Sequence, residues 1–271
     1  MMKNRSFVIG IALLTFFVSM AVLALFWTPF SYREVIEGAA LLKPSAKYLL
    51  GTDDLGRDVF SRLLVGAQFS LGIGILVGGI AVVIGASLGI IAAYFGRRID
   101  SILVQIMNAI QAMPSLLLAL FVVAILGPGV INTILSVTLV SIPTMFRLVR
   151  SAALVEVSKD YIVSAKALGA SHFRIIKSHL FPNCVTPILV QSAVCCSEAI
   201  LNTAALGFLG LGIPAPYPEW GTMLSDSKNF IETAPQLMTI PGLCLLLLIL
   251  STQLISDGLR DQLDPKLRGR T

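Results

Sequence analysis

Charged residues are scarce in this sequence. Only 13% of its 271 residues are Asp, Glu, Lys or Arg, and the mean hydropathy is +0.86. A soluble globular domain has about 25% charged residues, so the composition excludes an ordinary soluble domain and indicates a membrane protein. The net charge of +5 does not point to nucleic acid, because the basic residues lie beside apolar runs instead of forming a patch interleaved with aromatic residues.

Histidine and cysteine are also rare. The two His and four Cys residues form no CxxC pair and no ligand spacing, so we expect neither a disulfide framework nor a metal site. His172 and His179 are expected to face solvent or a partner. Met107 and Met113 are expected to fill the core rather than bind copper or nickel.

Two functional patterns are missing. The sequence has no G-x-x-x-x-G-K-[ST] segment to cradle nucleotide phosphates, so any ATP has to be bound by a partner. No cluster of His, Cys and acidic residues resembles a catalytic set. We therefore expect a chain without catalytic residues and without a cofactor of its own.

Long apolar runs dominate what is present. Each can cross a hydrocarbon core of about 30 Å as a helix, which predicts an all-α polytopic membrane protein with six transmembrane helices. The first run is long for the apolar part of a signal peptide, so we expect it to be retained. The tight turn Gly-Pro-Gly at 127–129 predicts a helical hairpin. The six runs lie at about 7–27, 69–95, 102–127, 130–148, 186–206 and 236–256.

The positive charges predict the orientation. With both termini inside, fourteen Lys and Arg residues lie on the inner side and six on the outer side. This divides the chain into an inner N-terminus with the first span, an outer segment, a membrane core and an inner tail. The core includes an inner loop at about 158–183 and an outer loop at 207–235. The other three parts are 1–28, 29–68 and 258–271, and the core is 69–257.

The outer segments carry their own signals. Asp53/Arg57 and Asp58/Arg62 stand four residues apart, which suits an exposed or interfacial helix. Three prolines within 214–218 exclude a helix there and predict a structured loop, with Tyr217 and Trp220 suited to the headgroup level. In the second span, two G-x-x-x-G patterns at 74–78 and 85–89 indicate close helix packing.

The inner loop is basic and helix-prone. Gly169 divides it into one short helix at 161–168 and another at 171–180, with Pro182 ending the second. Ile162, Ala165 and Leu168 share one face and form an apolar knob. Such a segment suits docking into a groove of another protein or resting on anionic lipid, and the physical pattern alone does not separate the two.

Polar residues inside the spans are candidates for a substrate pathway. In the fifth span, Gln191, Glu198 and Asn202 fall within about 40° of one another on a helix. The third span adds Asn108 and Gln111. The alternative for each is a hydrogen bond between helices, with Glu198 protonated by burial.

The inner loop resembles the EAA loop of permease subunits in binding-protein-dependent ABC importers. Ala165, Gly169 and Pro182 match that pattern, whereas Val163 replaces its acidic residue. Further stretches are similar to the peptide and nickel branch, and most like the second permease of dipeptide and oligopeptide systems. These are "LGTDDLGRDVFSRLL" (50–64), "PSLLLAL" (114–120), "AALGFLGLG" (204–212), "PEWGTMLSD" (218–226) and "DGLRDQLDPKL" (257–267).

The resemblance implies a type I ABC importer permease fold in a bacterial inner membrane, with both termini cytoplasmic and the outer segments periplasmic. The implied partners are a second homologous permease, two ATPase subunits that bind ATP and Mg, and a periplasmic solute-binding protein. The loop implied to contact the ATPase comprises Ser164, Ala165, Lys166, Ala167, Leu168, Gly169, Ala170 and Ser171. The outer loop implied to guide solute includes Tyr217, Glu219 and Trp220.

The implied cargo is a dipeptide or oligopeptide, with nickel or a metal chelate as the alternative. The family that this chain resembles usually has an acidic residue at the position of Asn108. A different class of protein, a secondary transporter or channel, remains an alternative interpretation of the sequence. Inverted repeats and broken helices would favour it, and the sequence shows neither clearly.

Overall fold

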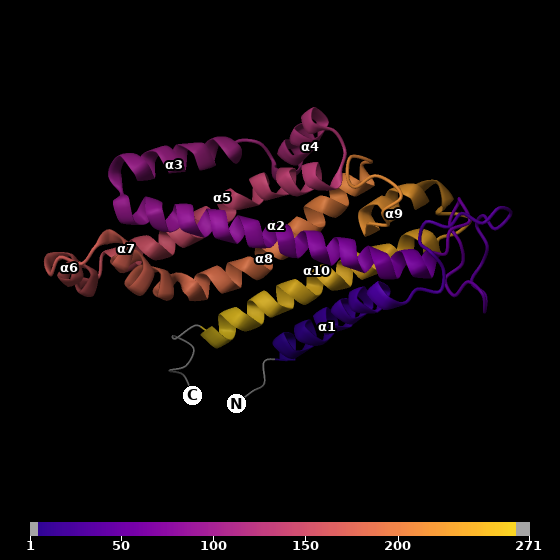
Figure 1. The fold of residues 1–271 in the computed structure, drawn as a ribbon, viewed down its shortest axis with the longest axis horizontal. Coiled ribbons are helices and arrows are strands. Elements are labelled where there is room, and N and C mark those ends of the chain that lie inside the picture. Colours follow the sequence, from indigo (N-terminus) through magenta and orange to yellow (C-terminus); the bar gives the residue numbers. More distant parts are fainter. Residues whose placement is uncertain (1–4, 264–271) are drawn as a thin grey trace.

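The computed structural model describes residues 5–263, and these form a bundle of helices joined mostly by short turns (Figure 1). Within these residues the only β-type pairing is an isolated bridge between Thr52 and Asp58. The elements are α1 (Arg5–Phe26), α2 (Val59–Phe95), α3 (Arg97–Ile110), α4 (Ser115–Leu126), α5 (Val130–Val157), α6 (Asp160–Ala167), α7 (His172–Ile175), the π-helical turn η1 (Ile176–Leu180), α8 (Phe181–Phe208), α9 (Trp220–Ser227), the 3₁₀ turn η2 (Lys228–Phe230) and α10 (Gln236–Leu263).

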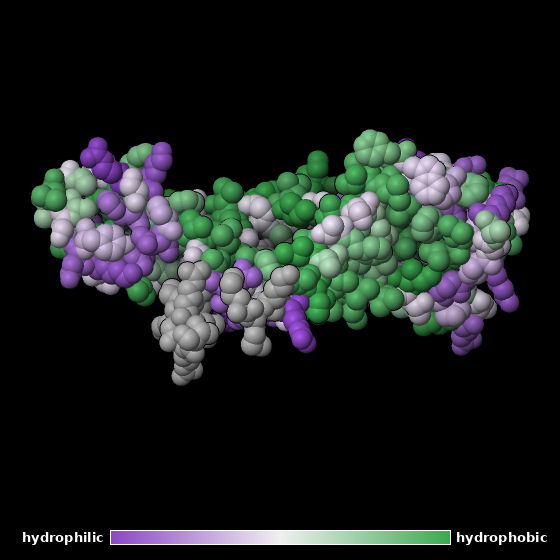
Figure 2. Space-filling model, turned by 90° about the horizontal axis from the view of Figure 1, so that it is seen from below, coloured by the Kyte–Doolittle hydropathy of each residue, from purple (hydrophilic) through white to green (hydrophobic). Residues whose placement is uncertain are grey.

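The predicted all-α membrane fold is confirmed. Five helices are long and apolar enough to cross a bilayer, and a sixth span is reached if α3 and α4 count as one. Figure 2 shows the corresponding surface, an apolar belt between two polar ends. One end carries α6 and α7, and the other carries α9 and the segment before α2. Residues 1–4 of the predicted N-terminus and 264–271 of the predicted tail lie outside the described part.

The third span differs from the prediction of one continuous helix at 102–127. Helices α3 and α4 are bent by 82° across residues 111–114. Pro114 has no N–H and disfavours helical geometry in the residue before it, which explains why the first helix ends there. The broken helix that the sequence did not show clearly is therefore present.

Helix α2 packs against both α5 and α8 through glycines. A Cβ at Gly74 or Gly78 would lie 2.5–2.6 Å from the side chains of Ile200 or Cys196 on α8. A Cβ at Gly89 would lie 2.9 Å from backbone atoms of α5. Both G-x-x-x-G patterns thus mark real helix contacts, as predicted, because small residues let helix backbones approach closely in lipid.

Helix α2 begins at Val59, ten residues before the predicted start at 69. Asp58 caps it by accepting hydrogen bonds from the backbone N–H and hydroxyl of Ser61, at 2.8 and 2.7 Å. The exposed or interfacial helix predicted from the Asp53/Arg57 and Asp58/Arg62 spacing is therefore not found, because these four residues are buried and helix α2 begins only at Val59. Asp53 and Arg57 do pair, at 2.6 Å, but in a buried turn, and Asp58 is occupied by the cap.

Replacing Gly89 by Val should force α2 and α5 apart, because the new side chain meets rigid backbone of α5. We expect a destabilisation of about 1–3 kcal/mol, typical of overpacking. The matched control is Gly79→Val on the same helix, where nothing lies within 4 Å of the added Cβ. Thermal unfolding of the purified chain in detergent measures both, and equal melting temperatures would contradict the packing described.

Candidate functional site

One end of the molecule carries an elbow, defined here as residues 160–175, formed by α6, a turn and α7 (Figure 1). Gly169 has a φ of +78°, in the left-handed region where a residue with a Cβ is strained. Ser171 caps α7 by accepting a hydrogen bond of 3.4 Å from the Arg174 N–H. The predicted division of this segment at Gly169 is confirmed.

The apolar surface of the elbow is not the one predicted. Ile162 is fully buried inside the chain and Ala165 packs beside it, so neither belongs to an outward knob. Leu168 is 88% exposed, and Phe173 and Val163 are also exposed. A large apolar side chain that is almost fully exposed at a polar end of a membrane protein is available to a partner.

The elbow is tied to the bundle at two places. The hydroxyl of Tyr94, on α2, lies 2.7 Å from Nδ1 of His172, and the Lys166 ammonium lies 4.8 Å from the centre of the Tyr94 ring. Tyr161 donates a hydrogen bond of 2.6 Å to Glu156, on α5. Burial and then this carboxylate raise the pKa of Tyr161 to about 12, so the phenol stays protonated and keeps donating.

The second part of the elbow runs directly into a membrane span. The sequence prediction that Pro182 ends a helix is wrong, because residues from His172 to Phe208 form one continuous helical rod. The turn before the proline is the π-helical turn η1 (Ile176–Leu180). Its wider hydrogen-bonding pattern accommodates a residue that lacks an N–H and would clash with the carbonyl four residues earlier.

A cavity of about 440 Å³ lies beside the break between α3 and α4. It brings together three of the predicted pathway residues, Gln111 from the break and Glu198 and Asn202 from α8. Ser115 of α4 and Ser141 and Thr144 of α5 add hydroxyl groups to its lining. Irregular backbone at membrane depth is tolerated where it lines a cavity, so the break and the cavity belong together.

The other two predicted pathway residues lie elsewhere. Asn108 is exposed, and its side-chain oxygen accepts a hydrogen bond of 2.9 Å from Arg147 of α5. Gln191 is buried and lines a second cavity between α5, α8 and α10. The five residues therefore form no single cluster.

The loop at the opposite end is packed into the protein. Trp220 is fully buried, donates a hydrogen bond of 3.1 Å to the Leu63 carbonyl, and contacts Phe17 edge to face. Its side chain therefore packs inside the protein and does not contact lipid headgroups, the role for which its residue type was suited. Tyr217 is half-buried and stacks at a tilt on Phe69, with ring centres 5.1 Å apart.

Glu219 fixes the start of α9. Its carboxylate accepts hydrogen bonds of 2.8 and 3.0 Å from the N–H groups of Gly221 and Thr222. Burial raises the pKa of Glu219 to about 7, although these two donors favour the ionised form. The side chain fits because Gly207 of α8 has no Cβ, which would lie 2.5 Å from the carboxylate.

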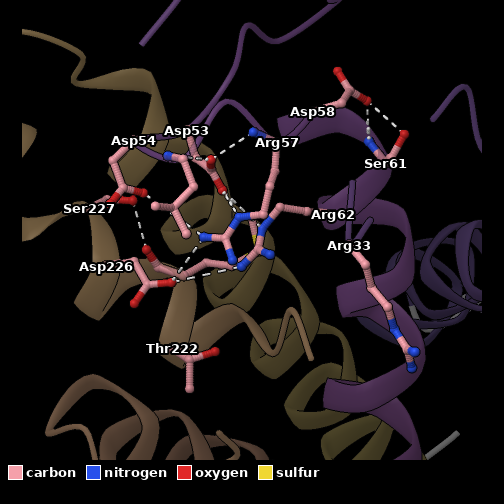
Figure 3. Close-up of polar contacts among 12 residues, drawn as sticks. Arg33, Asp53, Asp54, Arg57, Asp58, Ser61, Arg62, Thr222, Asp226 and Ser227 are labelled. Atoms are coloured by element: carbon pink, nitrogen blue, oxygen red, sulfur yellow. Dashed lines mark hydrogen bonds and ion pairs between the residues drawn. The ribbon is translucent and has the colours of Figure 1, made fainter. Parts of the chain in front are cut away.

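A charge cluster joins α9 to the start of α2, and it is buried except for Asp226 (Figure 3). Arg57 and Arg62 are 6% and 3% exposed, and both reach toward Asp53 and Asp226. The nitrogen–oxygen distances are 2.6 and 3.4 Å to Asp53, and 3.8 Å from each guanidinium to Asp226. Sequence spacing predicted the Asp53–Arg57 pair, but nothing in it indicated the contact to Asp226, more than 160 residues away.

The sequence did not predict a further ion pair, between α3 and α5. Arg150 of α5 binds Asp100 of α3 through two hydrogen bonds of 2.5 and 2.6 Å. Both residues stand at the ends of predicted spans, on the same side of the membrane. Their opposite charges at one membrane face were the only sequence feature that could have indicated the pair. The pair holds α3 along α5, and thus helps to position the break that lines the cavity.

Comparison with known proteins identifies a family and relatives that this chain resembles. Residues 85–269 match the family described as binding-protein-dependent transport system inner membrane component. The dipeptide transport system permease protein DppC of Alkalihalophilus pseudofirmus is 44% identical, over 98% of this chain and 88% of its own length. The same-named protein of Escherichia coli is 44% identical, and the di/tripeptide permease DppC of Pseudomonas aeruginosa 42%, each over 98% of this chain and 91% and 89% of their own lengths.

A solved structure has the same fold. A chain from inward facing conformations of the MetNI methionine ABC transporter superposes with a TM-score of 0.61 at 20% identity, covering 77% of this chain and 96% of its own. At that identity the similarity supports only the fold, which is that of a type I importer permease. Together with the match over residues 85–269 and the near full-length relatives, it shows that the chain belongs to the family of inner membrane components of binding-protein-dependent transport systems.

Proposed function

We propose that this chain is the permease subunit that forms half of the translocation pathway in an ATP-driven importer of dipeptides and oligopeptides. The observation that carries the proposal is the near full-length similarity, at 41–44% identity, to permeases named for dipeptide or di/tripeptide transport. These names do not favour a nickel or metal-chelate cargo. Family membership argues against a secondary transporter or channel, despite the broken third span.

The chain needs partners for this task. The family context supports a solute-binding protein, a second permease and ATPase subunits, and we infer one similar permease and two ATPases per assembly. The elbow end would face the cytoplasm, in keeping with the basic residues on that side. ATP and Mg would be held by the ATPases, and this chain would act as a non-catalytic transport subunit.

The elbow is the proposed contact with an ATPase. Leu168 and Phe173 offer apolar anchors at the tip, and the Gly169 turn holds them outward. The contact would extend over Ser164, Ala165, Lys166, Ala167, Leu168, Gly169, Ala170 and Ser171. Because α7 continues through η1 into α8, displacement of the elbow would move the helix that carries Glu198 and Asn202.

The cavity at the helix break is the proposed passage for the peptide. Glu198 is its only charged lining residue among those that the structure describes. A carboxylate facing a polar cavity inside the membrane suits the ammonium group of a free peptide amino terminus. Gln111 and Asn202 can hydrogen-bond peptide amides, whereas Asn108 and Gln191 lie outside this cavity. Tyr217, Glu219 and Trp220 would support the outer entrance as packed residues.

Replacing Leu168 by Glu should uncouple the ATPase. Placing a charge on the most exposed apolar anchor should weaken ATPase binding by about tenfold or more, as expected for an interface hot spot. The measurement is co-purification of the ATPases with the permease, together with ATP-driven peptide uptake in vesicles.

Leu49→Glu is the matched control, because Leu49 is 54% exposed at the opposite end. It should retain the ATPases in full. Equal retention by both variants would mean that the elbow is not the docking surface.

Replacing Glu198 by Gln should lower peptide uptake by about tenfold while ATPase binding and the melting temperature stay unchanged, because only the charge in the cavity is lost. Glu198→Asp should restore much of the rate. Glu232→Gln, an exposed acidic position outside the cavity, serves as the control. Normal uptake by Glu198→Gln would leave Glu198 a packing residue.

A further inference from the structure

A second cavity, of about 450 Å³, lies at the elbow end of the bundle between α5, α8 and α10. It is lined by the late part of α5, the early part of α8 and the last turns of α10, all of which lie at the end where α5 leads into the elbow and α8 emerges from it. Figure 1 shows α8 and α10 running side by side there. Neither the elbow (residues 160–175) nor the outer loop (residues 207–235) contributes to its lining.

The second cavity continues the first one along the same helix faces. On α8, Gln191 and Val194 line the second cavity and Glu198 lines the first. Gln191 and Val194 lie seven and four residues before Glu198, so all three side chains are on one face of the helix. On α5, Leu148 follows Thr144 by one turn in the same way. The two cavities therefore follow the same faces of α5 and α8, one beside the helix break and the other toward the elbow end.

Among residues 5–263, one charge of each sign lines the second cavity. Asp257 and Arg260 stand on neighbouring turns of α10 at its exposed mouth, and Gln253 and Gln191 lie farther in. Within residues 5–263, neither the Asp257 carboxylate nor the Arg260 guanidinium has a hydrogen-bond or ion-pair partner. The neighbouring residue Gly258 faces away from the cavity. It packs against Phe7 of α1 so closely that there is no room for a Cβ.

We propose that this second cavity is a binding site for the dipolar form of a short peptide on its way into the cytoplasm. Asp257 receives the α-ammonium group, Arg260 binds the α-carboxylate, and Gln191 and Gln253 hydrogen-bond the peptide amide. The inference rests on the proposed import of peptides and adds the residues and the ligand chemistry of the inner end of the pathway.

The spacing of the two charges fits a short peptide. Side chains three residues apart on a helix have Cβ atoms about 5–6 Å apart. An extended dipeptide spans about 7 Å between its termini, because each residue adds at most about 3.6 Å. The guanidinium can grip a carboxylate through two parallel hydrogen bonds, which an ammonium group cannot do. An extended peptide of three or more residues exceeds this span, so the pair of charges fits an extended dipeptide best.

The test is equilibrium binding of radiolabelled alanyl-alanine to the purified complete transporter, without binding protein and without nucleotide. Asp257→Asn and Arg260→Gln should each weaken binding by about tenfold, the loss expected for one charge-assisted contact. Arg260→Gln should not further weaken binding of the C-terminal amide, and Asp257→Asn should not further weaken binding of the N-acetyl derivative. Arg98→Gln, at the same end but outside the cavity, is the matched control.

The charge-retaining variant Asp257→Glu should recover most of the affinity, and Arg260→Lys should recover part of it, because a lysine keeps the charge but not the two parallel hydrogen bonds. Such recovery separates lost recognition from lost folding. Unchanged binding in both neutral variants, or absence of alanyl-alanine binding to the wild-type transporter at millimolar concentration, would overturn the inference. ATP-driven peptide uptake by the same wild-type preparation is measured in parallel. Normal uptake with unchanged binding refutes this site alone, whereas absence of peptide uptake refutes the proposed function.

Discussion

The close approach of α2 to α5 and α8 is the contact on which the architecture depends. Apolar side chains gain little from leaving lipid for another helix, so association relies on tight packing at small residues. Gly74 and Gly78 provide it toward α8, and Gly85 and Gly89 toward α5. With both helices held on one side by α2, the groove on their other side stays open for the two cavities. Tyr94, at the end of the same helix, also anchors the elbow.

The rod from His172 to Phe208 connects the elbow to the membrane interior. About 26 residues separate its start from Glu198, a distance of about 39 Å at 1.5 Å per residue. The rod contains two sites where its hydrogen bonding is interrupted, the π-helical turn η1 and Pro187. Kinks in helices arise at such sites, so bending is expected there rather than elsewhere along α8. Both lie between the elbow and Glu198, and Pro187 lines the second cavity.

Features set by composition or local pattern were predictable from the sequence. The spans followed from hydropathy, the α4–α5 hairpin from Gly-Pro-Gly, and the elbow turn from Gly169. Features that depend on distant partners were not. Tryptophan usually suits a membrane interface, but Trp220 is buried because Gly66 leaves room for its ring. Averaging hydropathy over the third run concealed the break at 111–114, and Pro182 stayed in a helix because a π-helical turn preceded it.

The two ends of the chain are built for different mechanical tasks. At the α9 end, Arg57 and Arg62 are desolvated, and separating them from Asp53 and Asp226 would leave buried charges uncompensated, which is strongly unfavourable. Trp220 and Glu219 bind the same loop to α2 and α8, so α9 is expected to move together with the start of α2 as one body. The elbow is held by apolar packing and by the Tyr94 and Tyr161 hydrogen bonds, without a buried ion pair among the described residues, and its most exposed apolar side chain is unpartnered within residues 5–263. Motion within this chain is therefore expected at the elbow end. In the proposed importer, access from outside would then change at the boundary with the second permease.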